Sequence, residues 1–169
     1  EEMKRILKTS ETTFKTLTMS QNEYLEAFES TYSIMKNGMS ENGDAISYTN
    51  KMLQISADLF NTYGKSTDYY SSAINWALKG VYSYVDNLNI GIKGTQEGFI
   101  EAANNAGILG RQIQSVSELS SDEIIDVIQS RRLDFLESYF NNIPQEEKKH
   151  VRYLVSDMYD GYKHLAGRQ

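Results

Sequence analysis

The fold is decided by residues 44–80, which read DAISYTNKMLQISADLFNTYGKSTDYYSSAINWALKG. Asp44 has a short side chain that can accept hydrogen bonds from the unpaired first amides of a helix. The apolar residues that follow recur on one helical stripe: Ile46, Leu53, Ala57 and Phe60. Gly64 then ends the stripe, so the pattern predicts an amphipathic helix that fills part of a helical core.

A second helix is predicted after a short polar turn. Ser66 or Thr67 begins it and Gly80 ends it. Its apolar positions again share a face: Tyr70, Ala73, Ile74, Ala77 and Leu78. Residues 81–90 are rich in valine and tyrosine, which suits a strand, but their helical neighbours favour another short helix.

Two further helices flank this pair. Ser20 and Glu23 have the spacing of a capping box, in which a hydroxyl and a carboxylate each bind an otherwise unpaired backbone amide. They predict a helix over 21–37. Thr95 is placed to cap another helix, which ends at Gly107. The first two thirds of the chain therefore predict an array of amphipathic helices.

Composition narrows the class of protein. The chain has 169 residues and a formal net charge of −6, which argues against a dominant nucleic-acid surface. It has no cysteine, so disulfides, thiolate catalysis and cysteine-based zinc sites are excluded. No stretch reaches the roughly 20 apolar residues that span a bilayer, and no signal peptide is visible. Because the chain does not begin with Met and stops after GRQ, we expect a fragment cut at both ends.

The last third of the chain has a different pattern. Ser120 and Glu123 again have capping-box spacing, which favours a helix over 121–129. Residues 124–128 taken alone could instead form a buried strand. Residues 132–141 place apolar side chains on one face of a further helix.

After residue 141 the order of the predicted elements becomes typical of an α/β protein. Pro144 begins a short turn of helix, and residues 151–155, VRYLV, are the best strand candidate. Asp157 follows this strand, and another helix runs to Gly167. The order of helix, strand, Asp and helix is typical of α/β folds. The fold class is thus mainly α, with an N-terminal array of amphipathic helices followed by a small α/β remnant of one or two strands.

The front of the chain resembles phage tail tape-measure proteins of Firmicutes phages and prophages, over residues 54–108. Motifs of that family occur in order as Ala57-Asp58-Leu59, Ala77-Leu78-Lys79-Gly80 and Asn87-Leu88-Asn89-Ile90. The resemblance implies a long, non-enzymatic helical rod that sets tail length during virion assembly. It also implies tail-tube and chaperone proteins as partners, self-association through helices, no cofactor, and a place in the bacterial cytoplasm and then in the virion tail.

The back of the chain resembles insertion-sequence transposases of the DDE type, over residues 124–166. The matching residues are Ser130-Arg131-Arg132, Leu136, Tyr139-Phe140, Val151-Arg152, Asp157-Met158, Tyr159 and Tyr162. The resemblance implies an RNase H-like core and metal-dependent DNA strand transfer in the cytoplasm. It implies DNA as the partner and Mg²⁺ or Mn²⁺ as the cofactor.

By this resemblance, Asp157 is catalytic and a metal ligand, as the second acid of a triad. Two divalent ions roughly 4 Å apart activate a water or a 3′-hydroxyl, and a carboxylate at a rigid strand end holds them accurately. The family's first Asp belongs on an earlier strand, where this chain carries helices. Its final Glu belongs beyond residue 169. We therefore expect no catalysis by this chain alone.

Several candidates also have plainer interpretations. Asp157 could simply cap the helix that follows it. His150 and His164 lack the spacing of metal ligands. A basic patch that could contact phosphates, or be a solvated helix face, comprises Lys148, Lys149, Arg152, Arg131 and Arg132. Two glycine pairs have the spacing of an RNA-binding loop but stand where helices stop: Gly91 with Gly94, and Gly107 with Gly110.

We divide the chain into a helical tape-measure-like segment, 1–115, a junction, 116–130, and a partial RNase H-like transposase segment, 131–169. The junction falls somewhere within 116–131. It could reflect a mobile element in a prophage tail gene, a misjoined fragment, or one family that contains both halves. We expect the two segments not to share an interior. We also expect uncovered apolar strand surface to make the chain aggregate.

The tape-measure hypothesis takes first place because it covers more of the chain, and the transposase fragment is the alternative. One structural observation would separate the two hypotheses. The transposase hypothesis predicts that residues 151–156 pair with 124–128 as β-strands. One continuous helix over 120–141 would instead favour the tape-measure hypothesis through the junction.

Overall fold

The computed structural model describes residues 1–17 and 19–148, so predictions about residues 149–169 lie outside it. The described part is mainly α-helical, as predicted, and contains no β-strand. Its helices are α1 (Glu2–Thr16), α2 (Gln21–Gly38), α3 (Ala45–Tyr63), α4 (Thr67–Leu78), α5 (Gln96–Ala106), α6 (Ser121–Asn142) and α7 (Gln145–Lys148). Two short 3-10 helices are η1 (Val85–Leu88) and η2 (Val116–Glu118).

Local capping signals set the helix ends. The Ser20 amide donates to Glu23 Oε2 at 2.7 Å, and the Glu23 amide donates to Ser20 Oγ at 3.3 Å, which completes the predicted capping box. The Asp44 carboxylate accepts from two first-turn amides of α3. Ser66 caps α4 and Thr95 caps α5 in the same way. These predictions are confirmed. They could be made from the sequence because each cap depends on only a few neighbouring residues.

The segment 81–90 contains the short 3-10 helix η1 rather than a strand. Val85 and Leu88 are completely buried in it. Asn89 ends it in the left-handed region, with φ of 54°. The preference for a helix at this ambiguous segment is confirmed.

Helix α6 corrects the prediction at the junction. Residues 124–128 are helical, so the alternative of a buried strand there is wrong. The separate helices predicted over 121–129 and 132–141 form one continuous helix. No glycine or proline stands between them, so nothing interrupts the backbone hydrogen bonds.

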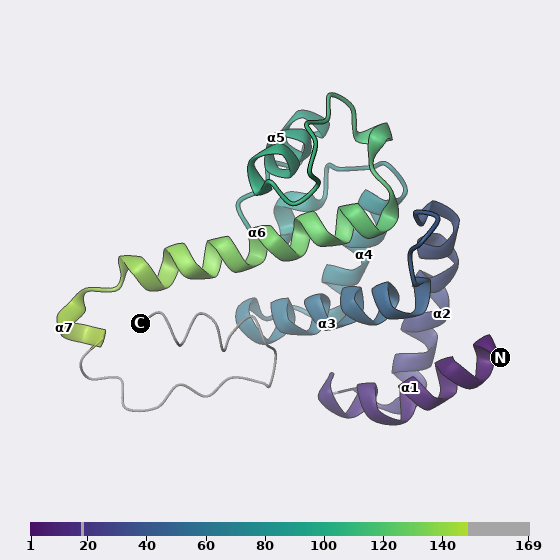
Figure 1. The fold of residues 1–169 in the computed structure, drawn as a ribbon. Coiled ribbons are helices and arrows are strands. Elements are labelled where there is room, and N and C mark those ends of the chain that lie inside the picture. Colours follow the sequence, from purple (N-terminus) through teal and green to yellow (C-terminus); the bar gives the residue numbers. More distant parts are fainter. Residues whose placement is uncertain (18, 149–169) are drawn as a thin grey trace.

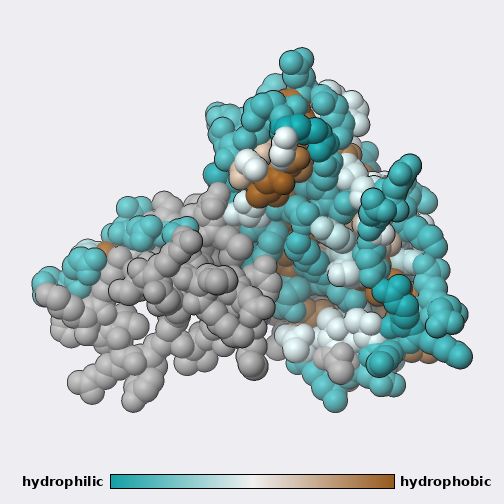
Figure 2. All heavy atoms as spheres, viewed as in Figure 1, coloured by the Kyte–Doolittle hydropathy of each residue, from teal (hydrophilic) through white to brown (hydrophobic). Residues whose placement is uncertain are grey.

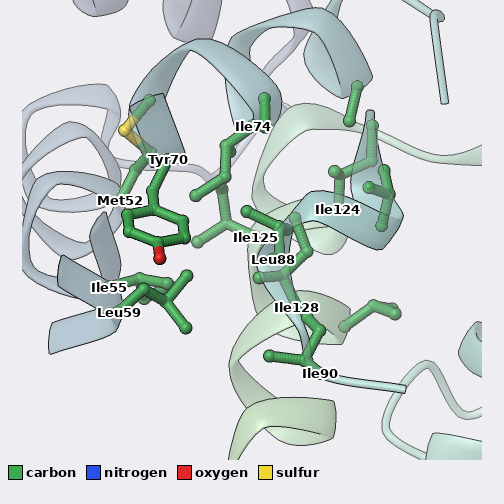
Figure 3. Packing of buried hydrophobic residues seen from close by; sticks show 14 of the residues in the cluster. Met52, Ile55, Leu59, Tyr70, Ile74, Leu88, Ile90, Ile124, Ile125 and Ile128 are labelled. Atoms are coloured by element: carbon green, nitrogen blue, oxygen red, sulfur yellow. The ribbon is translucent and has the colours of Figure 1, made fainter. Parts of the chain in front are cut away.

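One hydrophobic core joins the helices of the front of the chain to the predicted junction (Figure 3). Side chains of α3 and α4 meet those of the η1 region and of α6: Met52, Ile55, Leu59, Tyr70, Ile74, Leu88, Ile90, Ile124, Ile125 and Ile128. Ile125 and Ile128 have no exposed surface. These core residues of α6 lie within the predicted junction, so the expectation of separate interiors for 1–115 and 131–169 stays a prediction. The division by origin into 1–115 and 131–169 stays a prediction.

The helices pack around α6 and α3 (Figure 1). Helix α6 contacts α5 on one side and α3 on the other, and α2 and α4 pack against α3. Helix α1 packs on α2 at the edge of the molecule. The described residues thus form a packed globule and not the extended rod that the tape-measure resemblance implies.

The surface shown in Figure 2 is mostly hydrophilic, with a hydrophobic patch over the lobe that contains α5. None of the helices in the described part combines the length and the apolar content that crossing a bilayer requires.

Candidate functional site

Most residues of the sequence-predicted site lie outside the described part of the chain. These are Asp157, His150, His164, Lys149 and Arg152. The roles predicted for them stay predictions. Of the segment that resembles transposases, the structure describes α6 and the short α7. The contacts of α6 are therefore the part of the candidate site that can be examined.

The structure removes Arg132 from the predicted basic patch. Its Nη1 lies 3.2 Å from Asp58 Oδ2 on α3, and the two side chains are only 4% and 5% exposed. Gln54 also donates to the second carboxylate oxygen of Asp58, at 3.0 Å. A buried guanidinium that is held by a carboxylate cannot bind a phosphate at the surface. Both alternatives given for the basic patch, a phosphate contact and a solvated helix face, are therefore wrong for Arg132.

A second polar contact ties α6 to α3 through Asp126. The Tyr48 hydroxyl donates to Asp126 Oδ2 at 2.9 Å, and Lys51 Nζ donates to Oδ1 at 2.6 Å. Lys51 also lies over the Tyr48 ring, 5.0 Å from its centroid. Burial, and then the adjacent Asp126 carboxylate, raise the pKa of Tyr48 to about 12. The hydroxyl therefore stays protonated and remains a donor at neutral pH.

The first turn of α6 is anchored by two acids. The Ser40 amide and hydroxyl donate to Asp122 at 3.0 and 2.7 Å. Burial alone would raise the pKa of Asp122, but these hydrogen bonds lower it. Arg111 binds Glu123 in a bidentate contact, at 2.5 and 2.9 Å, which lowers the pKa of Glu123. Both carboxylates thus form contacts that fix the start of α6 against its neighbours.

No group of three or more acidic, histidine or cysteine residues in the described part could hold a metal ion. The acids at the start of α6 are instead bound to Ser40, Arg111 and Lys51. The described residues therefore offer no cluster of ligands for a divalent metal, and Asp157 lies outside them.

The glycine pairs have structural explanations, as expected. Gly107 ends α5 in the left-handed region, with φ of 68°, and Gly91 follows η1 with φ of 74°. Gly94 packs closely, because a Cβ atom there would lie 2.8 Å from the backbone oxygen of Ser83. Neither pair needs an RNA ligand to explain it.

An open groove of about 560 Å³ lies beside α2 and α4. Its polar lining includes Glu23, Glu26, Lys65, Asp68 and Asn75. With three acids against one lysine, the groove disfavours an anionic ligand. It also lies apart from α6.

The ion pair between Asp58 and Arg132 was not predicted from the sequence. A signal was present, since Asp58 stands between Ala57 and Leu59 on the buried side of an amphipathic helix. A charged residue there demands a partner of opposite charge. Its identity could not be read from the sequence, because Arg132 lies on another helix.

Comparison with known families bears on the end of the chain that contains α6. Residues 102–169 match the model of the ISL3 family of DDE transposases, described as "Transposase". This segment is similar to transposases. The match covers less than half of the chain, begins within α5 and includes all of α6. No curated protein and no solved structure matches the chain. None of the comparisons supports the tape-measure resemblance or its phage partners.

Proposed function

We propose that this chain is part of a DDE-type transposase and serves DNA transposition by metal-dependent strand transfer. The family match over residues 102–169 carries this proposal. It contains the whole of the segment 124–166, in which the sequence resembles these enzymes. It also contains Asp157, to which the resemblance gives the role of a metal-binding acid.

In this proposal the described residues support the site. Helix α6 is held by its core side chains, by Asp58 and by the partners of its acids. It therefore provides a rigid base for the segment that follows it. A divalent metal, when bound, would activate the attacking oxygen of water or of a DNA 3′-end. Asp157 would contribute one carboxylate to the binding of this metal.

The tape-measure hypothesis has less support than the transposase hypothesis. It predicted one continuous helix through the junction, and α6 is continuous. However, α6 lies within the segment that is similar to transposases, so its continuity no longer favours a tail protein. The strand pairing predicted for residues 151–156 lies outside the described part. We therefore do not propose a role in the phage tail.

The proposal is tested by the binding of Mn²⁺, which broadens NMR signals of nearby nuclei. Titration of the labelled chain is expected to broaden amide signals around Asp157 selectively, and Mg²⁺ is expected to compete. Asp157→Asn should abolish the effect. Asp68→Asn, the same change at an exposed acid of α4, should leave it intact. Broadening that is unaffected by Asp157→Asn would overturn the proposal.

A further inference from the structure

Three aromatic side chains are exposed along α4 and the loop that follows it. Tyr69, Trp76 and Tyr84 are 40%, 44% and 45% exposed. The rings of Trp76 and Tyr84 adjoin, with centroids 6.0 Å apart and an interplanar angle of 35°. A single exposed aromatic residue is ordinary, but adjoining ones indicate a binding surface.

Two lysines accompany these rings. Lys79 Nζ lies 5.1 Å from the centroid of the Trp76 ring, and Lys65 Nζ lies 6.0 Å from that of Tyr69. Neither lysine forms an ion pair within the described part of the chain. Lys51, which also lies over a tyrosine ring, is by contrast held by a carboxylate. The two amines therefore remain available to an anionic ligand.

The spacing places these groups on one side of α4. Tyr69 and Trp76 are seven residues apart, which is close to two helical turns, so their side chains leave the helix in nearly the same direction. At 1.5 Å per residue they are separated by about 10.5 Å along the axis. This distance corresponds to about three steps between stacked bases of one DNA strand.

We propose that this surface, which we call the α4 aromatic face and define as Lys65, Tyr69, Trp76, Lys79 and Tyr84, binds single-stranded DNA. Unpaired bases stack on the exposed rings, and the two lysines bind the phosphates. The inference rests on the proposed function for the class of ligand. Single-stranded DNA suits the site because every base offers a flat face, whereas a duplex hides these faces between its base pairs.

The charges around the surface also favour one strand over a duplex. Lys65 belongs to the lining of the neighbouring groove, together with the acids Glu23, Glu26 and Asp68, and these acids repel a second phosphate backbone on that side.

Trp76 is the only tryptophan of the chain, so its fluorescence reports directly on this surface. Titration with a short thymidine oligonucleotide in EDTA is expected to quench the emission. Affinity should fall with salt, with a log–log slope of about −1.4 for two phosphate contacts at about −0.7 each. Tyr84→Ala should weaken binding roughly 5- to 150-fold through the loss of one stacked base. Lys79→Glu should also weaken it, and Lys8→Glu on α1 should not.

Two ligand controls separate stacking from charge. An abasic oligonucleotide of equal length keeps the phosphates but lacks the bases, and it should quench far less. A duplex of equal length should likewise bind more weakly. Equal binding of the abasic strand, or quenching that survives both Tyr84→Ala and Lys79→Glu, would overturn the inference.

A measurement without DNA tests whether the surface binds a second copy of the chain. A measurement on the Asp157 variant tests whether DNA binding is independent of the metal site. Self-association that shields Trp76 in the absence of DNA would show that the surface binds a second copy, and would overturn the inference. Asp157→Asn should leave the quenching unchanged, because the α4 aromatic face needs no metal. If Mn²⁺ binds at Asp157 but no oligonucleotide quenches Trp76, only this inference fails and the proposed function stands.

Discussion

Arg132 of α6 and Asp58 of α3 form a buried ion pair, with Nη1 3.2 Å from Oδ2. Arg132 belongs to the segment that is similar to transposases. Asp58 belongs to the part of the chain before that segment. Because both side chains are almost fully buried, the pair makes the packing of each segment depend on the other.

Removing one member of this pair is expected to destabilise the protein strongly. Arg132→Met places an apolar side chain beside the buried Asp58 carboxylate, and Asp58→Asn removes the negative charge that faces the guanidinium. A broken buried pair typically costs about 3–5 kcal/mol in the free energy of unfolding. Urea unfolding followed by circular dichroism measures this change.

The double variant Asp58→Leu with Arg132→Met provides the control, since replacing both charges by apolar groups removes the unpaired charge. It should recover most of the lost stability. Arg5→Met, which breaks the exposed pair with Asp44, should cost no more than about 1 kcal/mol. If Arg132→Met costs no more than Arg5→Met, the buried pair does not hold α6.

Truncating a core residue of α6 should be as costly as truncating one of α3. Ile125 and Leu53 are both fully buried in the same cluster. Each substitution to Ala is expected to cost about 2–5 kcal/mol and to lower one shared thermal transition. Ile108→Ala, at a position 46% exposed, serves as the control and should change stability little. Two separate transitions for Ile125→Ala would contradict a common core.

Tyrosine ionisation should destabilise the fold at high pH. Burial is the main cause that raises the pKa of Tyr24, Tyr48 and Tyr82 to about 12. The folded state therefore holds these protons more tightly than the unfolded state, in which the pKa is about 10. Their contribution to stability is complete below about pH 10 and is lost as the pH rises towards 12. Tyr48→Phe should flatten this loss, and an unchanged pH profile would contradict the assignment.

Loss of the first cap of α2 should have a moderate cost. Ser20 accepts a hydrogen bond from the Glu23 amide, which has no other partner within the first turn. Ser20→Ala is expected to cost about 1 kcal/mol in chemical unfolding. Ser47→Ala, at an exposed position inside α3, should stay within about 0.5 kcal/mol of the parent. Equal effects would show that the cap is not formed.

The local part of the fold could be predicted from the sequence. Asp44, Thr95 and Gly107 act through hydrogen bonds or backbone conformations within one turn, so their roles are visible in a short window. Helix α1 was not predicted, because no side chain caps its first turn. Its place is set by packing on α2 and by the contact of Lys36 with Glu2.

The long-range part could not be predicted. The sequence did not show that the apolar face of α6, within the predicted junction, completes the core of α3 and α4. Arg132 was grouped with other basic residues of the same stretch, but its side chain is buried against Asp58. Only the tertiary arrangement decides which core a helix completes and whether a charged side chain is buried. The aggregation expected from uncovered strand surface stays a prediction, which a monomeric, cooperatively melting chain would contradict.

The central claim is that α6 belongs to the same cooperative unit as the helices before it. Native-state hydrogen exchange in increasing urea tests this claim most directly at the amides of Leu53 on α3 and Ile125 on α6. We predict that both exchange only by global unfolding, with the same free energy of opening and the same dependence on urea. Exchange of Ile125 at a distinctly lower free energy, while Leu53 stays protected, would contradict the common core.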